Sequence, residues 1–559
     1  MIKHLFIFYR NMKTTLKTLI LNCLLASCFI TVHGQDFYAS QRASWLQKAK
    51  ESIPQLTVTE KKPVGLVHII KDENAFQQYK AEQTAPINTL YDNSFKETKA
   101  VIVDFGEHIT GSFSFSTELL KAEADAPARF KLTFGEVPSE LVTPFDPYQG
   151  GLSRAWLQDE IVTMMTMPST ITIPRRVSFR YVKIELIATP PGYDFCISGM
   201  KCDAVTSAVN TPGELSAATP QIFKDIDRVS LNTLKECMQT VYEDGPKRDQ
   251  RLWLGDLYLE ALANNYSFKQ YNLTKRCLYL LAGLSEHNGK LNATVFETQE
   301  PKPQAKQHLY DYSFLFGVTL KDYLQETGDR ETAEDLWPVV KKQLESAYQY
   351  LQDDGTMDYE RASREWWIFF DWKDGLHREV AFHGVTVFAF KETYELAKLL
   401  NKENEVAQLP GLIKKMKKAA RKHFYNPKTG LFTGKLNDQV SYASQIWMIL
   451  GEIPTQKEAQ RSLKALKTTE NVCTPGAPYL FHYYIEALIK SGMPQEARNE
   501  VAEYWGGMIH KGADTFWEVY DPKNEFLSPY NFFPVNSYCH AWSCTPTYFI
   551  RKYPEIFQE

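Results

Sequence analysis

Four acidic side chains, three basic ones and a tryptophan lie within segment 243–256, a composition unusual for residues that only pack. A glycine followed by a proline interrupts helical periodicity there, which predicts a turn that leads into a helix. Such a turn can direct Asp244, Asp249 and Asp256 into one cleft. Trp253 offers an apolar face beside them, and paired carboxylates next to an aromatic ring suit the hydrolysis of glycosidic bonds. The alternative is a solvated helix cap, in which these acids pair with neighbouring arginines.

A second candidate segment lies near the C-terminus, where G-A-D-T-F-W-E-V-Y occupies 512–520 and N-S-Y-C-H-A-W occupies 536–542. Together with 243–256, these residues resemble the α-L-rhamnosidases of glycoside hydrolase family 78. That family carries a D-C-P-x-R-x-E-R-x-G-W-x-G-D-like motif, which supplies the general acid, and a later G-A-T-T-x-W-E motif, which supplies the general base. The resemblance implies that Glu518 is the base and that His540 contacts the sugar. A histidine that only packs beside a tryptophan is the alternative.

The acid motif departs from the family pattern. Where that pattern reads R-D-E-R-L-G-W, this chain reads R-D-Q-R-L-W over 248–253 and is one residue shorter. Alignment from the left places Gln250 on the acid, although an amide cannot serve as a proton donor of this kind. Alignment from the tryptophan and the final aspartate places Asp249 there. We therefore predict that Asp249 is the general acid and Glu518 the general base of an inverting mechanism, with carboxyl groups roughly 6.5 to 9.5 Å apart.

An aromatic segment at 365–375, E-W-W-I-F-F-D-W-K-D-G, lies between the two motifs and is too polar for an ordinary core helix. We predict that Trp367 and Trp372 cover the apolar face of a sugar and that Asp371 accepts hydrogen bonds from its hydroxyl groups. A buried aromatic cluster is the alternative. Arg248 either binds substrate or pairs with a carboxylate to hold its loop. The complete predicted substrate-binding set is Asp244, Arg248, Trp253, Asp256, Trp367, Asp371, Trp372, Trp517 and His540.

Residues 1–34 have the three-part form of a secretory signal peptide. Four basic residues and no acid precede an apolar run at 19–32, and cleavage after Gly34 would be ordinary. We therefore expect export to the periplasm or beyond; a lipoprotein acylated at Cys28 is the alternative. No other stretch reaches the roughly 18 to 20 apolar residues that span a bilayer. Without the signal, 59 basic residues face 67 acidic ones, a net charge near −8 that argues against nucleic acid as a partner.

Periodicity divides the rest of the chain into two parts. Over 35–211, short alternating runs such as 181–187 are separated by glycines and prolines, which predicts a jelly-roll-like β-sandwich. Over 212–559, eleven amphipathic windows predict helices, among them 257–284 and 537–553. With one helix missed, these windows predict helix pairs that close into an (α/α)6 toroid. The family resemblance implies the same order, a β-sandwich followed by a helical catalytic domain.

Neither a metal nor a cofactor is expected from the residue pattern. His377 and Glu379 would diverge on a helix, and nothing else completes a set of ligands. On the family resemblance, we predict an exo-acting glycoside hydrolase that releases terminal α-L-rhamnose, or a closely related sugar, from an oligosaccharide or glycoside. Two alternatives stay open. One is a toroid-fold polysaccharide lyase, and the other is a carbohydrate-binding homologue without turnover, which Gln250 and the shortened motif would explain.

Overall fold

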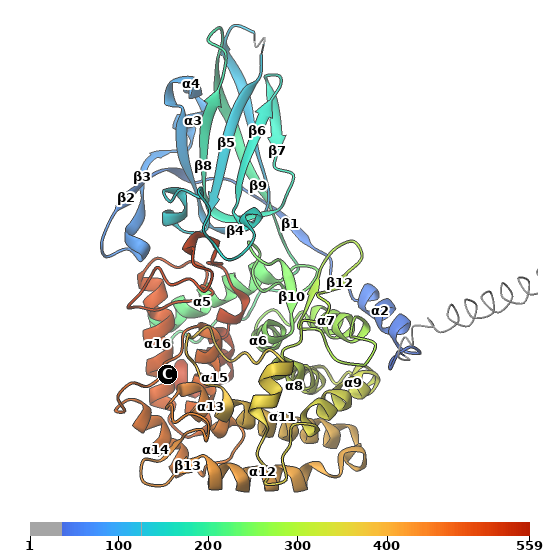
Figure 1. Ribbon diagram of the computed structural model, residues 1–559. Helices are drawn as coiled ribbons and strands as arrows, with labels where there is room; N and C mark the ends of the chain where they lie inside the picture. Colours follow the sequence, from blue (N-terminus) through green and yellow to red (C-terminus); the bar gives the residue numbers. More distant parts are fainter. Residues whose placement is uncertain (1–35, 124–125) are drawn as a thin grey trace, which may run out of the picture.

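The computed structural model describes residues 36–123 and 126–559 (Figure 1). The predicted signal peptide at 1–34 and the alternative acylation site, Cys28, lie outside these residues. Within the described residues, no helix has the length and apolar character needed to cross a membrane. An antiparallel β-sandwich precedes a helical toroid in the chain, so the predicted fold class is confirmed.

The β-sandwich forms the upper part of the molecule in Figure 1. Its strands run in the order β1-β9-β4-β8-β5-β6, while β2 pairs with β3 and β4, and β7 pairs with β4. The alternation S-F-S-F-S on β4 places Phe113 and Phe115 on one face, where they join a core cluster with Phe179 of β8. The strands are β1 (Thr57–Lys61), β2 (Gly65–Lys71), β3 (Tyr79–Pro86), β4 (Ala100–Lys121), β5 (Ala128–Gly135), β6 (Asp159–Met164), β7 (Ser169–Thr172), β8 (Val177–Ala188) and β9 (Asp194–Thr206).

Twelve helices of the described chain pair into six hairpins that close into a ring. Every residue of α6 is buried, whereas α12 buries 4 of its 15 residues, which distinguishes inner from outer helices. Each inner helix contacts the next, and the ring closes where His482 of α15 packs on Tyr548 and Phe549 of α17. The inner helices are α6 (Leu254–Asn265), α8 (Tyr310–Thr327), α11 (Glu379–Leu400), α13 (Tyr442–Leu450), α15 (Pro478–Lys490) and α17 (Pro546–Lys552). The outer helices are α5 (Gln221–Cys237), α7 (Tyr271–Gly283), α9 (Arg330–Tyr348), α12 (Leu409–His423), α14 (Gln456–Leu466) and α16 (Pro494–His510).

The helix missed in the sequence lies inside the window 257–284, which contains both α6 and α7. The chain turns between them because the Asn264 carbonyl accepts hydrogen bonds from the backbone of Ser267 and Lys269, and Lys269 adopts a left-handed φ of +55°. The window 537–553 was too long. Its helix begins only at Pro546, a residue that favours the first turn because it has no N–H to leave unpaired.

Smaller elements complete the fold. A three-stranded sheet, β10 (Arg251–Trp253), β11 (Thr294–Phe296) and β12 (Lys302–Pro303), holds the segment that enters α6. It lies at the end of the toroid nearest the β-sandwich (Figure 1). The remaining elements are α2 (Arg42–Glu51), α3 (Asn88–Tyr91), α4 (Phe95–Thr98), α10 (Tyr359–Glu365), α18 (Pro554–Phe557), β13 (Tyr425–Asn426) and β14 (Leu431–Phe432).

The inner ring depends on close approach of helices, which gives a test of the packing. A Cβ atom at Gly384 of α11 would lie 2.6 Å from the backbone of Trp447 in α13, so Gly384→Ala should lower the free energy of unfolding by about 1 to 3 kcal/mol. Gly411 of the outer helix α12 has no atom within 4 Å of that position. Gly411→Ala should raise the stability by up to about 1 kcal/mol, because alanine favours helix. Thermal unfolding followed by circular dichroism measures both, and equal effects would contradict this packing.

Candidate active site

A cavity lies at the N-terminal ends of four inner helices, α6, α8, α11 and α17. Segments that precede these helices, or form their first turn, supply the lining side chains. The structure brings most of the predicted residues together in this lining, namely Asp244, Arg248, Asp249, Trp253, Asp256, Trp367, Trp372, Glu518 and His540.

The shortened acid motif directs Asp249, and not Gln250, into the cavity. The Asp244 carboxylate accepts the backbone N–H of Asp249 at 3.1 Å, which fixes the turn. Each carboxylate oxygen of Asp249 lies 3.2 Å from an arginine nitrogen, one from Arg248 and the other from Arg251. Gln250 adopts a φ of +58°, and its side chain turns back to donate a 2.7 Å hydrogen bond to a carbonyl of its own loop. The glutamine is therefore not among the residues that line the cavity.

Glu518 is held by donors on both of its oxygens. Oε2 accepts hydrogen bonds from the Arg248 guanidinium and, at 3.1 Å, from the backbone N–H of Ser537. Oε1 accepts the hydroxyl of Tyr530, whose ring also lies under the same guanidinium at 4.4 Å. The indole of Trp542 donates to the Glu518 backbone carbonyl at 3.0 Å. One guanidinium therefore bridges the two carboxylates that were predicted to act as acid and base.

The pKa values of the carboxyl groups in the cavity are shifted in different directions because their neighbours differ. Burial raises the pKa of Asp244 well above its usual range, and the charge of Asp249 adds to this effect. Burial likewise raises the pKa of Asp256, helped by the charge of Asp244. Burial also acts to raise the pKa of Glu518, but the positive charge of Arg248 outweighs it and leaves this pKa below its usual value. Neighbouring groups thus shift the pKa values of carboxyl groups within one cavity in opposite directions.

Aromatic rings form the apolar wall of the cavity. Phe369 packs at 5.0 Å from Trp372 and stacks at 6.1 Å on Trp542, measured between ring centroids. Trp367 lies 6.3 Å from Trp372 and is 40% exposed, which places it at the mouth. Tyr530 closes the other side, 5.8 Å from Trp372. Such rings match the C–H faces of a sugar.

Two predicted substrate-binding residues lie elsewhere. Trp517 does not line the cavity; it is buried against the β-sandwich, where its ring stacks on Phe76 at 3.8 Å. Asp371 accepts a 2.5 Å hydrogen bond from the backbone N–H of Gly476 and is buried behind the aromatic wall, which raises its pKa to about 7. Both assignments relied on nearness in sequence, but neighbours in an irregular segment point in different directions.

The cavity also contains residues that the sequence analysis did not single out: Leu309, Tyr312, Phe369, Tyr530 and Trp542. Phe369 and Trp542 lie inside segments already singled out, so their aromatic character was an available signal. Tyr312 and Tyr530 lie in segments that carry no recognisable motif. Among the described residues, no group of three histidine, cysteine, aspartate or glutamate side chains is arranged to hold a metal ion.

Comparison with known families identifies both parts of the chain. Residues 213–553 match the bacterial α-L-rhamnosidase six-hairpin glycosidase domain, and residues 63–204 match the glycosyl hydrolase family 78 α-rhamnosidase N-terminal domain. The chain belongs to glycoside hydrolase family 78. The resemblance noted from the two motifs is therefore confirmed, and the protein is a glycosidase of the α-rhamnosidase family.

Solved structures of family 78 proteins share this architecture. This protein is 37% identical to a rhamnosidase from Klebsiella oxytoca with rhamnose bound. The two structures match with a TM-score of 0.88 over 92% of this chain and 99% of that one. It is 19% identical to the family 78 rhamnosidase of Bacillus sp. GL1, with a TM-score of 0.70 over 86% of this chain and 50% of that one, which shows the fold alone. No match was found among curated proteins.

The hydrogen bond from Tyr530 to Glu518 leads to a pH prediction. Because the pKa of Glu518 lies below 4.5, activity that needs its ionised form should persist as pH falls and be lost only below that value. Tyr530→Phe removes a donor to the ionised carboxylate, so the acidic limb of kcat/KM should move up by about one pH unit. Tyr148→Phe is the matched control, since its hydroxyl donates only to the Leu152 carbonyl at 2.8 Å. An unmoved limb in Tyr530→Phe would contradict this account.

Proposed function

We propose that this family 78 protein is an inverting, exo-acting α-L-rhamnosidase, with Asp249 as general acid and Glu518 as general base. The observation that carries the proposal is the shared cavity, in which both carboxylates contact one guanidinium, that of Arg248. The bound rhamnose in the 37% identical Klebsiella oxytoca rhamnosidase supports the choice of sugar. The inverting outcome rests on the acid and base roles carried over from the family motifs.

Glu518 is suited to activate a water molecule. Its lowered pKa keeps it ionised, and Oε1 accepts a hydrogen bond from Tyr530 alone among the described residues. A carboxylate oxygen has two lone pairs, so one on Oε1 is free to take a proton from water. The water would then attack the anomeric carbon from the face opposite the leaving group. Arg248 and Ser537, which bind Oε2, fix the direction in which Oε1 points.

The proton for the leaving group comes from the pair formed by Asp244 and Asp249. Burial and the charge of Asp249 raise the pKa of Asp244 well above its usual range, which favours the protonated form of Asp244. Both line the cavity. Alignment of the shortened motif places Asp249 at the position of the family's acid. We therefore assign to Asp249 the transfer of the proton to the glycosidic oxygen.

Two unpaired polar atoms provide sites for sugar hydroxyl groups. Asp256 Oδ1 and His540 Nδ1 are buried, lie 3.7 Å apart, and have no hydrogen-bond partner among the described residues. Burial lowers the pKa of His540 to about 4, so its ring is neutral at physiological pH and can accept or donate one hydrogen bond at Nδ1. Buried polar atoms normally have partners, and a bound hydroxyl would supply both.

The lining of the cavity supports a deoxy sugar as the substrate. Its aromatic wall favours a 6-deoxy sugar, because the methyl group of such a sugar is apolar. Trp367 at the mouth offers an apolar surface to whatever is attached to that sugar. We further propose that the protein acts outside the cytoplasm, which the signal-like residues 1–34 support.

Leaving-group dependence tests the acid. Asp249→Asn should lower kcat about 10² to 10⁴-fold on an alkyl α-L-rhamnoside but far less on the 2,4-dinitrophenyl rhamnoside, whose leaving group needs no proton. Glu518→Gln should impair both substrates alike. Gln250→Glu is the matched control and should change neither rate substantially. If Asp249→Asn lost activity equally on both substrates, the acid would be another residue. If Asp256→Asn, and not Asp249→Asn, lost activity mainly on the alkyl rhamnoside, the acid would be Asp256.

Stereochemistry tests the base. Proton NMR of early hydrolysis products should show the β-anomer of rhamnose released from an α-rhamnoside, because a water activated by Glu518 attacks the opposite face. Release of the α-anomer would reject the inverting mechanism. An unsaturated product would identify a lyase, and rhamnose binding without turnover on any substrate would identify a binding protein.

A further inference from the structure

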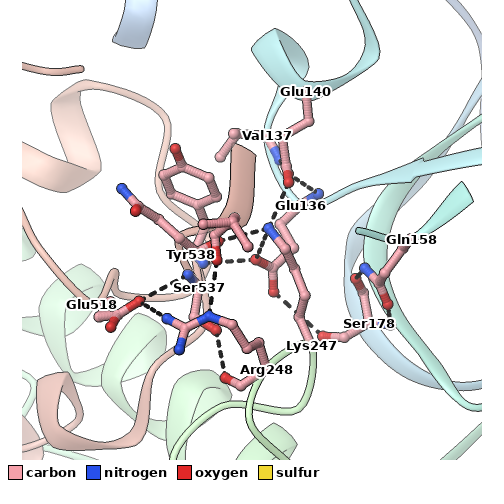
Figure 2. Close-up of polar contacts among 12 residues, drawn as sticks. Glu136, Val137, Glu140, Gln158, Ser178, Lys247, Arg248, Glu518, Ser537 and Tyr538 are labelled. Carbon is pink, nitrogen blue, oxygen red and sulfur yellow. Dashed lines mark hydrogen bonds and ion pairs between the residues drawn. The ribbon is translucent and has the colours of Figure 1, made fainter. Parts of the chain in front are cut away.

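Two buried glutamates of the β-sandwich reach the loop that carries the proposed acid (Figure 2). Glu136 directly follows β5, and Glu140 lies in the turn Pro138–Leu141. Glu140 Oε2 accepts the backbone N–H of Glu136 at 2.7 Å, which holds the two side chains in a fixed relation. Their common partner is Lys247, whose side chain is 1% exposed and which immediately precedes Arg248 in the chain.

Lys247 is fixed on three sides. Its ammonium lies 2.5 Å from Glu140 Oε1 and 3.2 Å from Glu136 Oε2, and it donates a 2.7 Å hydrogen bond to the carbonyl of Asn536. These contacts use all three ammonium protons. The third contact matters because Asn536 belongs to a different loop, the one that supports the proposed base. A single lysine therefore joins the β-sandwich to two loops of the toroid.

The β-sandwich also holds the second loop directly. Glu136 Oε2 accepts the backbone N–H of Tyr538 at 2.6 Å. Ser537 lies between the two anchored residues and faces the site: its N–H donates to Glu518 at 3.1 Å, and its hydroxyl donates to the Arg248 carbonyl at 2.9 Å (Figure 2). The relative position of the two proposed catalytic segments thus depends on groups from another domain.

The three charged groups of this cluster respond differently to burial. Burial and the charge of Glu136 raise the pKa of Glu140, although Lys247 acts to lower it. Burial acts to lower the pKa of Lys247, but Glu140 and Glu136 raise it overall, so the ammonium persists. Burial acts to raise the pKa of Glu136, but Lys247 and His108, whose Nε2 lies 3.0 Å away, lower it overall. Lys247 and Glu136 therefore each have an oppositely charged partner in the interior.

Apolar contacts also hold the two domains together, beside the three charged side chains. Phe76 stacks on Trp517 across the same boundary, and Phe145 and Leu157 of the β-sandwich pack with Val535. A buried ion pair contributes little net stability compared with apolar residues of similar size, because desolvation offsets the attraction. What a fully paired cluster does supply is a unique geometry, and this one fixes the backbone on both sides of the proposed acid and base.

We propose that Glu136, Glu140 and Lys247 are positioning residues, which hold the loops of Asp249 and Glu518 in register across the domain boundary. The β-sandwich then contributes to catalysis by fixing the positions of the two loops. The inference rests on the function proposed above. Displacement of a reacting group by about 1 Å can reduce the rate about 100-fold, so the effect should appear in kcat.

The test compares two variants of the full-length protein. Lys247→Met leaves buried carboxylates without their ammonium, so both Tm and kcat should fall, kcat by about 100-fold. Adding Glu140→Gln removes one uncompensated charge, so Tm should return toward the wild-type value. If the cluster positions the loops, kcat stays about 100-fold low in the double variant, while the Kd for rhamnose measured by calorimetry changes less than about threefold. Recovery of kcat in parallel with Tm would overturn the proposal.

A buried pair elsewhere serves as the control. Arg551 of α17 lies 2.7 Å from Asp227 of α5, and its side-chain hydrogen bonds within the described part of the chain go to Asp227, Thr547 and Gly213. Arg551→Met should lower Tm, and adding Asp227→Asn should restore part of it, with kcat close to wild type in the double variant. A loss of kcat here equal to that at Lys247 would show that any buried-charge defect reduces activity, and would reject a specific positioning role.

Amide hydrogen exchange separates this inference from the proposed function, because it needs no substrate. Residues 247–251 and 536–540 should exchange about tenfold or more faster in the Lys247→Met, Glu140→Gln variant than in the wild type, while α17 stays protected. Unchanged protection of both segments would overturn positioning even if the enzyme is an α-L-rhamnosidase. Absence of wild-type turnover on every α-L-rhamnoside would instead refute the function, with the exchange result still deciding the role of the cluster.

Discussion

The site depends above all on the buried guanidinium of Arg248. It pairs with Glu518, lies 3.2 Å from Asp249 Oδ1, and donates to the Val535 carbonyl at 2.9 Å. A buried cation that lacks any of its partners is strongly destabilising, so the acid loop, the base segment and the loop that contains Tyr530 must all be in place together. The geometry of the cavity follows from this requirement, because each of these segments supplies part of its lining.

The same interaction divides the carboxyl groups by role. Glu518 lies against the guanidinium, which lowers its pKa, whereas burial and neighbouring acids raise the pKa values of Asp244 and Asp256. Residues with the same chemical group thus become acceptors or donors according to their neighbours. The fold makes this arrangement compact, since the segments before four inner helices converge at one end of the toroid.

The β-sandwich covers this end of the toroid, and its contacts are of two kinds. Aromatic stacking between Phe76 and Trp517 joins the domains without specifying polar geometry. The cluster of Glu136, Glu140 and Lys247 contributes directed contacts to the loops themselves. Each domain has a large apolar core cluster, whereas the positions of the loops at the boundary depend on partners from both domains.

Local pattern predicted the fold class, and local pattern together with the family resemblance of the two motifs predicted most of the residues that line the cavity. Alternation such as S-F-S-F-S on β4, helical periodicity, and the spacing of Asp244, Asp249 and Asp256 are properties of neighbouring residues, which sequence displays directly. Tertiary structure alone decided that Trp517 packs on Phe76, that Asp371 binds the backbone of Gly476, and that Tyr530 contacts Glu518. These outcomes depend on the directions of side chains in irregular loops and on partners up to hundreds of residues away, and periodicity carries no information about either.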